Sequence, residues 1–398
     1  MIKRTLKKID MGRRNIFIST IKNELSAVFG DAGAMLLIVF AILIYTVVYS
    51  VAYGREVVTD VVIGVVNEDN TPSSRRLIDG LRSGPNTTVG YNPISTEDAE
   101  DMFYNNDIYG VVYIPSGYER SLLDGCQADV AVVLDGSHLL VYRQVLQQAV
   151  ADILATGANV EVERLVSNNM SGADITSLVQ PVVYDGHVMY NPSLGYGSFV
   201  MPSILIVIIQ QTLFIGLALI NVRRRDRDHI ILNITLWTSV KITLAKIIVY
   251  IIIYGISLTI ILGVVWPIFG FPYAGQTLDV VVMMTMYIIA ATSLGLSLSH
   301  LFRRREAPFL LLLWSSVPIL LLAGLSLPKE AFPGWLYAIG ELLPSSSAVR
   351  AFVEIGTMGA SLSDTSSELL RLTLLGAIYL FLAIVVEKYC SVSKKIDN

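Results

Sequence analysis

Long apolar runs occupy most of the second half of the chain, and one more lies near its start. They cover residues 32–54, 199–222, 242–268, 279–302, 307–327 and 369–386. A helix rises about 1.5 Å per residue, so an apolar run of about 20 residues crosses the roughly 30 Å hydrocarbon core of a bilayer. The pattern predicts an α-helical integral membrane protein with six transmembrane helices.

Residues 55–197 follow a different pattern, in which short strand-like runs alternate with helical ones. Four runs have the length of strands and end at proline or turn-forming residues: Val61–Val66, Ile108–Ile114, Val130–Leu134 and Val182–Tyr184. Helices are expected to begin near Pro72 and Thr96, and a longer one to cover residues 139–168. The alternation predicts an α/β domain inserted between spans 1 and 2.

The distribution of charge orients this layout across the membrane. Residues 55–197 contain 19 Asp or Glu, 7 Arg and no Lys, whereas the first thirty residues contain seven Lys or Arg. Short Arg-rich loops follow the second and fourth spans. Because Lys and Arg are retained on the cytoplasmic side, both termini and both loops are predicted inside and the α/β domain outside. The predicted order is a cytoplasmic basic segment (1–31), the first span (32–54), the extracytoplasmic domain (55–197), a five-helix membrane domain (198–388) and a cytoplasmic tail (389–398).

Two segments outside the spans have patterns of their own. Apolar residues recur at helical spacing between Phe17 and Val28, with Lys22 and Glu24 among the residues between them. This predicts an amphipathic helix in the cytoplasmic interface. Residues 328–367 are too mixed in polarity to cross the membrane, and they predict two short helices. These helices either re-enter the membrane or lie on its outer surface.

Composition excludes several classes of protein. The chain is 53% hydrophobic and only 16% charged, with a mean hydropathy of +0.60, which is typical of an integral membrane protein and not of a soluble enzyme. Basic residues do not cluster outside the membrane context, so no nucleic-acid partner is expected. Cys126 and Cys390 are predicted on opposite sides of the membrane, which excludes a disulfide between them.

The sequence contains none of the motifs expected of an enzyme. There is no G-x-x-x-x-G-K-[ST] phosphate-binding loop, no G-x-S-x-G and no H-E-x-x-H, and the four histidines are scattered. Asp135-Gly136-Ser137-His138 holds the residue types of a hydrolytic triad, but adjacency in sequence does not supply triad geometry. We therefore expect a turn there, no catalytic residue and no metal site in this chain.

The predicted spans carry few charges but some uncharged polar residues. Their carboxylates, Asp279, Glu306, Glu368 and Glu387, all lie near span ends. Ion-coupled transporters normally keep an ionisable group near the midplane, so ion-coupled transport is not favoured. Polar side chains lie deeper at Gln210, Gln211, Ser293, Ser297, Ser315 and Ser316. These residues either form hydrogen bonds between helices or line a substrate path.

Four short stretches resemble one transporter family. They are Asn191-Pro192 before the second span, Arg225-Asp226-Arg227-Asp228 after it, Ala245-Lys246 in the third span, and Gly324, Phe332-Pro333 and Pro344 before the last span. Their order is similar to that in the membrane subunit of type-2 ATP-binding-cassette (ABC) exporters with a large extracytoplasmic domain. The family usually has Glu in place of both Asp residues, and Gly-Thr where Ile230-Ile231 stands.

The resemblance implies an ABC transporter permease of the bacterial inner membrane that acts in efflux as a dimer. A separate cytoplasmic ATP-binding subunit would hold ATP and Mg²⁺, so this chain would need no cofactor. Residues expected to couple to that ATPase are Arg224, Arg225, Asp226, Arg227 and Asp228. The second permease copy is either identical or a paralogue, and a periplasmic adaptor is a further candidate partner beside the lipid bilayer.

Two other classes of membrane protein are alternatives to a permease. A membrane-anchored surface receptor would bind a ligand through its extracytoplasmic domain, but it would leave five further spans without a purpose. A membrane-embedded transferase would need His, Asp or Glu grouped near a span end, and no such group is evident. The permease interpretation accounts for more of the chain than either alternative.

Overall fold

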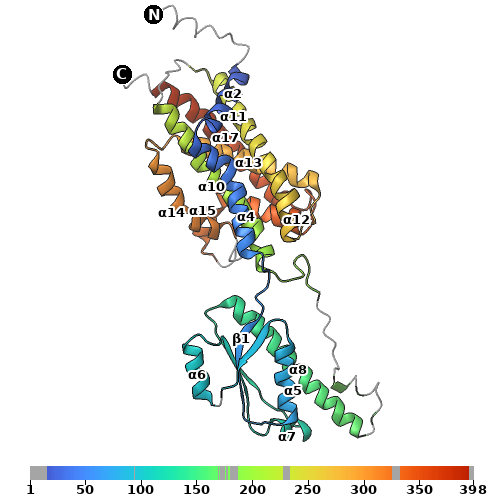
Figure 1. Ribbon diagram of the computed structural model, residues 1–398. Helices are drawn as coiled ribbons and strands as arrows, with labels where there is room; N and C mark the ends of the chain where they lie inside the picture. The colour runs from blue at the N-terminus through green and yellow to red at the C-terminus, as the bar shows by residue number, and fades with distance from the viewer. Residues whose placement is uncertain are drawn as a thin grey trace, which may run out of the picture. The chain divides into compact units, whose positions relative to one another are not determined.

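The chain divides into two compact units. The computed structural model describes residues 16–93, 95–168, 170, 175, 178–179, 187–226, 234–324 and 332–393. A helical unit combines residues up to Arg55 with those from Met189 onwards, and an α/β unit comprises Glu56–Val188. Figure 1 shows both units, which are described separately below.

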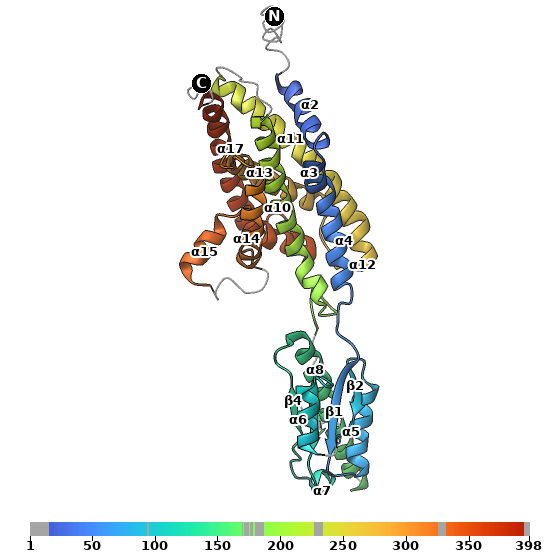
Figure 2. The same cartoon turned by 60° about the vertical axis from the view of Figure 1, so that its left-hand side comes forward.

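The helical unit consists of α-helices with three π-helical turns (labelled η). Its elements are α2 (Ile16–Phe29), α3 (Ala32–Met35), η1 (Leu36–Ala41), α4 (Ile42–Tyr53), α10 (Tyr196–Asp226), α11 (Leu236–Ile260), η2 (Ile261–Val265), α12 (Trp266–Phe269), α13 (Thr277–Ser299), α14 (Glu306–Leu322), α15 (Gly334–Glu341), α16 (Pro344–Phe352), η4 (Val353–Thr357) and α17 (Ser366–Ser393). Figure 2 shows them as a bundle.

Five helical segments in the described part of the chain are long and apolar enough to cross a membrane. They are Ala32–Tyr53, Tyr196–Arg225, Leu236–Phe269, Thr277–Ser299 and Ser366–Tyr389. These segments fit the predicted integral membrane protein. The sixth predicted span, at 307–327, corresponds to α14, which has only 17 residues, and residues 325–327 lie outside the described ones.

The second span is the centre of the bundle. In its most apolar stretch 83% of residues are buried, against 33% in the first span and 28% in the last. α10 packs against α4, α13, α14 and α16, so its apolar residues face protein on nearly every side. Leu against Leu gains little over Leu against lipid, and helices in a membrane associate through close packing and hydrogen bonds. The position of α10 therefore makes it the element on which the other spans are arranged.

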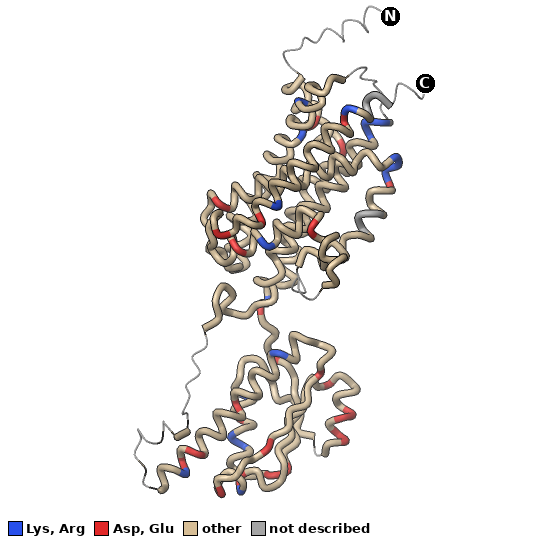
Figure 3. The backbone as a smooth tube through the Cα atoms, turned by 180° about the vertical axis from the view of Figure 1, so that it is seen from behind, with Lys and Arg blue, Asp and Glu red and all other residues tan. Residues whose placement is uncertain are grey.

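Charges in the helical unit gather towards the ends of its helices. Figure 3 shows Lys and Arg concentrated at the end formed by α2 and the last turns of α17, and a mixture of both signs at the opposite end. At that opposite end Arg350 contacts Glu341 at 2.8 Å and Glu368 at 2.9 Å, and Arg371 contacts Glu341 at 2.5 Å. These ion pairs join α15, α16 and the start of α17.

The segment predicted as re-entrant or interfacial contains α15, α16 and η4. α16 packs against α10, α13 and α17, and Ser345, Ser346 and Ser347 in its first turn are fully buried. The backbone N–H of Ser345 donates to the side-chain oxygen of Gln210 at 3.0 Å, so one orphan amide of the helix start is satisfied. Burial in protein is the condition under which a broken helix can enter a membrane, and the choice between re-entry and a surface position stays a prediction.

The α/β unit is built on a four-stranded sheet in the order β2-β1-β3-β4. Its elements are β1 (Val61–Asn67), α5 (Pro72–Ser83), β2 (Thr87–Tyr91), α6 (Thr96–Tyr104), β3 (Gly110–Ile114), α7 (Tyr118–Leu123), β4 (Ala131–Leu134) and α8 (Leu139–Ser167). β1 pairs in parallel with β2 and β3, and β4 is antiparallel to β3. The sequence pattern did not predict β2, and the predicted strand Val182–Tyr184 lies outside the described residues.

Chain direction explains which helices cover which face of this sheet. β1–α5–β2 moves one way along the sheet and β2–α6–β3 moves back past β1. Crossovers between parallel strands are almost always right-handed, so α5 and α6 must lie on opposite faces. α5 and α8 lie together on one side in Figure 1, and α6 lies on the other. Leu77, Leu81, Val145 and Ala149 form part of the core between α5, α8 and the sheet.

The first and second spans approach each other closely at Gly216. A Cβ placed on Gly216 would lie 2.3 Å from Cγ1 of Ile38, a fully buried residue of η1. Only glycine allows this approach without movement of the π-helical turn. Gly255, in α11, has open space at the corresponding position.

We expect Gly216→Ala to destabilise the protein and Gly255→Ala to leave it unchanged or slightly more stable. Both changes gain the same helix propensity, about 1 kcal/mol, but Gly216→Ala also overpacks Ile38 at a cost of about 1–3 kcal/mol. The measurement is the apparent melting temperature of the purified protein in detergent. A melting temperature of Gly216→Ala equal to that of Gly255→Ala would contradict the close approach.

Candidate functional site

The C-terminal turn of α10 carries three successive arginines, each with its own partners. Arg223 contacts the carboxylate of Asp31 at 2.9 Å and donates to the carbonyl of Gly30 at 2.9 Å. Arg224 pairs with Glu24. Arg225 donates to the carbonyl of Phe302 at 3.1 Å, beyond the end of α13. Cations are favoured at a helix C-terminus, where the dipole is negative, and these three also tie that terminus to its neighbours.

Asp31 has two functions at this end of the bundle. Its side chain accepts hydrogen bonds from the backbone N–H groups of Gly33 and Ala34, both at 3.1 Å, and so caps the start of the first span. Burial acts to raise the pKa of Asp31, but these hydrogen bonds and the nearby guanidinium of Arg223 outweigh it and hold the pKa below its ordinary value. The carboxylate is therefore charged where it meets Arg223.

Glu24 is a fully buried carboxylate on α2. It accepts a hydrogen bond from the hydroxyl of Tyr250 at 2.6 Å and pairs with Arg224. Burial acts to raise the pKa of Glu24, but the charges of Arg224 and Lys246 and the hydrogen bond from Tyr250 hold it below its ordinary value. An ionised buried carboxylate needs such partners, and Glu24 thereby fixes α2 to α10 and α11.

Lys246 and Glu387 form a second buried ion pair near Glu24. The Nζ of Lys246 lies 2.8 Å from Oε2 of Glu387, and the two side chains are only 7% and 15% exposed. Nε2 of His300 lies 3.9 Å from the same carboxylate oxygen, while its Nδ1 donates to the carbonyl of Leu296 at 2.9 Å. The pair joins α11 to α17, and His300 connects both to the end of α13.

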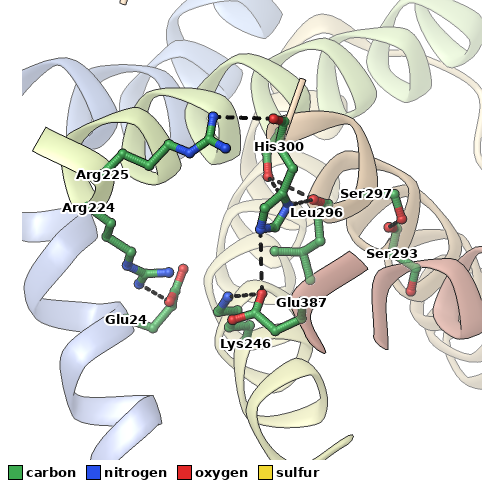
Figure 4. Close-up of polar contacts among 10 residues, drawn as sticks. Glu24, Arg224, Arg225, Lys246, Ser293, Leu296, Ser297, His300 and Glu387 are labelled. Carbon is green, nitrogen blue, oxygen red and sulfur yellow. Dashed lines mark hydrogen bonds and ion pairs between the residues drawn. The ribbon is translucent and has the colours of Figure 1, made fainter. Parts of the chain in front are cut away.

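Together these groups form a buried polar cluster, defined here as Glu24, Arg224, Tyr250, Lys246, His300 and Glu387. Figure 4 shows the charged members pointing towards one another from α2, α10, α11, α17 and the end of α13. Removing a charge from water costs several kcal/mol per ion, which only well-placed partners offset. Displacing any one helix would separate partners, so the cluster makes this end of the bundle move as a linked set.

The structure places only part of the predicted coupling set. Arg224 and Arg225 lie in the last turn of α10 and turn inward to α2 and to the end of α13. The backbone of Asp226 ends α10, and its side chain is not among those described. Arg227 and Asp228 lie outside the described residues. The predicted loop therefore begins directly beside the buried polar cluster.

Sequence reasoning missed most partners in this cluster. Glu24 was assigned to the polar side of an amphipathic helix, and Glu387 was noted only as lying near a span end. One observation pointed to them: Lys246 stands inside an otherwise apolar run. An ionisable residue in a membrane span needs a partner, and Lys246 could have prompted a search for a carboxylate at the same depth.

The polar residues predicted to line a path separate into different environments. Gln211 and Ser316 line one open pocket of about 430 Å³ between α4, α10 and α14, whose walls are otherwise mostly apolar. Both amide atoms of Gln211 are buried without a hydrogen-bond partner among the described residues. Gln210 instead faces the start of α16, and Ser315 is not part of the pocket lining.

Ser293 and Ser297 do not line that pocket either. Both lie on α13, where Ser293 is fully buried and the hydroxyl of Ser297 donates to the carbonyl of Ser293 at 2.9 Å. Figure 4 shows them one turn apart, beside the residues of the buried polar cluster. For Ser297, hydrogen bonding within its own helix explains its position. The pocket thus brings together only Gln211 and Ser316 of the six predicted residues.

The residues that resemble family motifs mostly shape turns. The Asn191 side chain accepts from the N–H of Gly195 at 3.1 Å and donates to its carbonyl at 2.9 Å, which closes the turn before α10. Pro192 follows in that turn. Gly324 has a φ of 88°, a conformation that L-residues rarely adopt, directly after α14. Phe332 and Pro333 precede α15, and Pro344 opens α16.

Asp135, Ser137 and His138 do not form a catalytic triad. The Ser137 hydroxyl lies 3.0 Å and the Asp135 carboxylate 2.6 Å from the same ring nitrogen, Nδ1 of His138. A triad needs serine and aspartate on opposite ring nitrogens, so that one nitrogen can take the serine proton while the aspartate holds the N–H of the other. The hydrogen bonds from Ser137 and His138 lower the pKa of Asp135 to about 2. The group is a charged turn before α8.

In the α/β unit, Asp69 and Glu119 accept hydrogen bonds from backbone N–H groups beyond the carboxyl ends of β1 and β3. Asp69 accepts from the backbone N–H groups of Gly117 at 2.9 Å and Glu119 at 3.2 Å, and Glu119 accepts from the N–H of Ser73 at 3.0 Å. Sheets in which the chain winds in both directions from a central strand usually bind ligands at this point. Here the helix starts that would receive an anion already hold Asp69 and Glu119.

Five apolar spans and buried charge pairs at the end of the bundle define a multi-pass integral membrane protein. The chain belongs to the ABC-2 family of transporter proteins, because the model of that family matches residues 34–385. It is therefore the permease subunit of an ABC-2 type transporter, and its family implies a partner ATP-binding subunit.

Named relatives agree with this family. The chain is 23% identical over 354 residues to the probable multidrug ABC transporter permease YbhR of Escherichia coli K12, an alignment that covers 88% of this chain and 90% of YbhR. It is 25% identical over 390 residues to the inner membrane transport permease YhhJ of the same strain, covering 94% and 96%. The similarity therefore includes both units of the fold.

Removing one charge of the Lys246–Glu387 pair should destabilise the protein more than removing both. Lys246→Met leaves a buried carboxylate and Glu387→Gln leaves a buried ammonium, each at a cost of about 3–5 kcal/mol, whereas the double variant leaves neither. The apparent melting temperature in detergent measures the effect. Arg76→Met is the control, because Arg76 and its partner Glu163 are 53% and 61% exposed, and such surface pairs contribute at most about 1 kcal/mol. Additive losses in the double variant would argue against a coupled buried pair.

Proposed function

We propose that this protein is the permease of an ATP-driven exporter in the bacterial inner membrane, and that it works with a second permease copy and a cytoplasmic ATPase. The observation that supports this most is the buried polar cluster, which links the last turn of α10 to four other helical elements. A permease that draws its energy from another subunit needs such a connection between its surface and its spans.

The loop that follows α10 is the proposed contact with the ATPase. A rotation of that loop acts first on the last turn of α10, where Arg223, Arg224 and Arg225 are held to the first span's start, to α2 and to the end of α13. Because these contacts are ionic and largely buried, they resist separation and pass the displacement on. Arg225, Asp226, Arg227 and Asp228 therefore act in coupling and not in chemistry.

The pocket that contains Gln211 and Ser316 is the proposed part of the substrate path. Its lining is mostly apolar, and its polar groups include the Ser316 hydroxyl and the Gln211 amide, which has no hydrogen-bond partner among the described residues. Such a site suits an apolar molecule that carries one or two hydrogen-bonding groups. The relative YbhR is named a probable multidrug permease, and we extend that class of substrate to this chain as part of the proposal.

Charge supports an orientation with both termini in the cytoplasm and the α/β unit outside. Lys and Arg concentrate at the end of the bundle formed by α2 and the last turns of α17, as Figure 3 shows. An even number of spans is needed for both termini to share a side, so we assign α14 as the sixth span. Its 17 residues reach about 25 Å, which a locally thinned bilayer or a slight extension beyond Leu322 accommodates.

A surface receptor remains the less favoured function. Asp69 and Glu119 already occupy the starts of α7 and α5, where the α/β unit would be expected to bind a small anionic ligand. Family membership over residues 34–385 also includes the spans that a receptor would not need.

Reversing Asp226 and Asp228 to Lys should uncouple ATP hydrolysis from transport while the protein still reaches the membrane. Like charges brought together at an interface cost several kcal/mol, so the ATPase would dock poorly or transmit its motion poorly. The measurement is transport by the complex in vesicles beside its substrate-stimulated ATP hydrolysis. Glu100→Lys with Asp101→Lys is the matched control, because these acids are exposed on α6 of the α/β unit. Unchanged transport and unchanged ATPase binding would show that the loop is only a solvated turn.

Thiol labelling should place the α/β unit outside. Cys126 is exposed, and in spheroplasts a membrane-impermeant reagent should modify it without permeabilisation. In a variant with Cys126→Ser and Cys390→Ser, a cysteine introduced by Asn233→Cys should react only after permeabilisation, because the loop after α10 is proposed to be cytoplasmic. The opposite order of labelling would reverse the proposed orientation.

A further inference from the structure

α8 leaves an apolar strip uncovered on the side that faces away from its own domain. Its inner side packs Val145 and Ala149 towards α5 and the sheet, and Val160 is also buried. On the outer side Val150 is 43% and Leu154 67% exposed. Helical residues three and four apart share a face, so Arg143, Gln147, Val150, Leu154, Ala158 and Glu161 form one continuous strip along α8. We call these six residues the α8 strip.

Charge is absent from the middle of the α8 strip and present at both of its ends. Between Arg143 and Glu161 the only charged residue of the helix is Asp152, which accepts from Gln148 at 2.8 Å and lies near Gly80 of α5. Arg143 is exposed and has no ion pair among the described residues, and Glu161 pairs with Arg164 at 2.6 Å through one oxygen. The strip therefore has a positive end, an apolar centre and a negative end.

This order of charges complements itself only when two copies run in opposite directions. Arg143 and Glu161 each lie nine residues from position 152, and Val150 and Leu154 each lie two residues from it. An antiparallel pair centred at position 152 thus sets Arg143 of each copy beside Glu161 of the other, and Val150 beside Leu154. A parallel pair would set Arg143 against Arg143 and Glu161 against Glu161, which costs free energy.

We propose that the α/β units of two permease copies associate through the α8 strip, as an antiparallel helix pair with two-fold symmetry. A symmetric pair needs a self-complementary surface, which this strip supplies. The inference rests on the proposed function, because it requires a second copy of the permease. It adds the surface through which the two copies meet outside the spans. Ala158 in the strip and Gly157 beside it are small residues, which allow close approach of the two helices.

The apolar centre is too small for a stable dimer of free domains. Val150 and Leu154 remove too little apolar surface from water to offset the translational and rotational freedom that two free domains would lose on association. Two units tethered to paired membrane domains do not bear most of that cost, because their effective concentration is of millimolar order. The contact is therefore a property of the assembled transporter.

Disulfide crosslinking in native membranes tests both the contact and its direction. Full-length copies with Cys126→Ser and Cys390→Ser are expressed together under two different tags, one with Val150→Cys and the other with Leu154→Cys. Disulfides need Cα atoms closer than about 7 Å. An antiparallel pair gives the mixed disulfide between the two tags, and little disulfide when both copies carry the same cysteine. Tyr104→Cys, at a position 82% exposed on α6, is the control that should not crosslink.

Charge reversal provides the second arm. Arg143→Glu or Glu161→Arg alone should cause loss of the mixed disulfide, and both changes in every copy should restore it. Co-purification of the two tags, measured in the same membranes, separates failure of this inference from failure of the proposed function. Tags that co-purify without any crosslink, or with disulfides only between identical positions, would overturn the α8 pairing alone. Tags that do not co-purify would overturn the second copy and the pairing together.

Discussion

Buried charge is the constraint on which the helical unit depends. Glu24, Lys246 and Glu387 lie in an apolar bundle where each isolated ion would cost several kcal/mol, and each is held by a partner on another helix. Replacing such pairs with apolar residues is often neutral for stability, so stability alone does not explain them. What the charges add is a requirement that α2, α10, α11 and α17 keep their relative positions. Apolar packing in lipid does not impose that requirement, because one apolar contact is nearly as good as the next.

Two kinds of contact hold the bundle, and they lie at different depths. In the middle, α10 packs through small or apolar residues such as Gly216, where van der Waals contact with Ile38 sets the spacing. At the end that carries α2, ion pairs and capping groups such as Asp31 set it instead. Apolar contacts in the middle allow the helices to slide past one another by a small amount. The ion pairs and hydrogen bonds at the end depend on the direction between donor and acceptor. The end contacts therefore oppose a change in the relative positions of several helices at once, whereas each contact in the apolar middle concerns one pair of helices.

Periodicity and charge counting predicted the element types well where the pattern was long. Five of the six apolar runs correspond to helices long and apolar enough to cross a membrane, and β1, β3, β4, α5, α6 and α8 appear close to their predicted positions. The strand β2 was missed because Thr87–Tyr91 contains Gly90 and little apolar surface. Site partners were harder to predict. Glu387 lies 141 residues from its partner Lys246 in the sequence, and Glu24 lies 200 residues from Arg224 and 226 residues from Tyr250. No local pattern records such distant contacts; only the cost of an unpaired Lys246 pointed to them.

The occupied helix starts of the α/β unit bear on what that unit can recognise. To admit a phosphate or carboxylate at the starts of α5 and α7, the unit would have to expel Asp69 and Glu119 and leave their hydrogen-bond donors to the new anion. The exchange replaces one anion by another with no net gain in hydrogen bonds. A ligand of this unit would therefore gain little from a negative charge at these helix starts and would depend on shape and apolar contact.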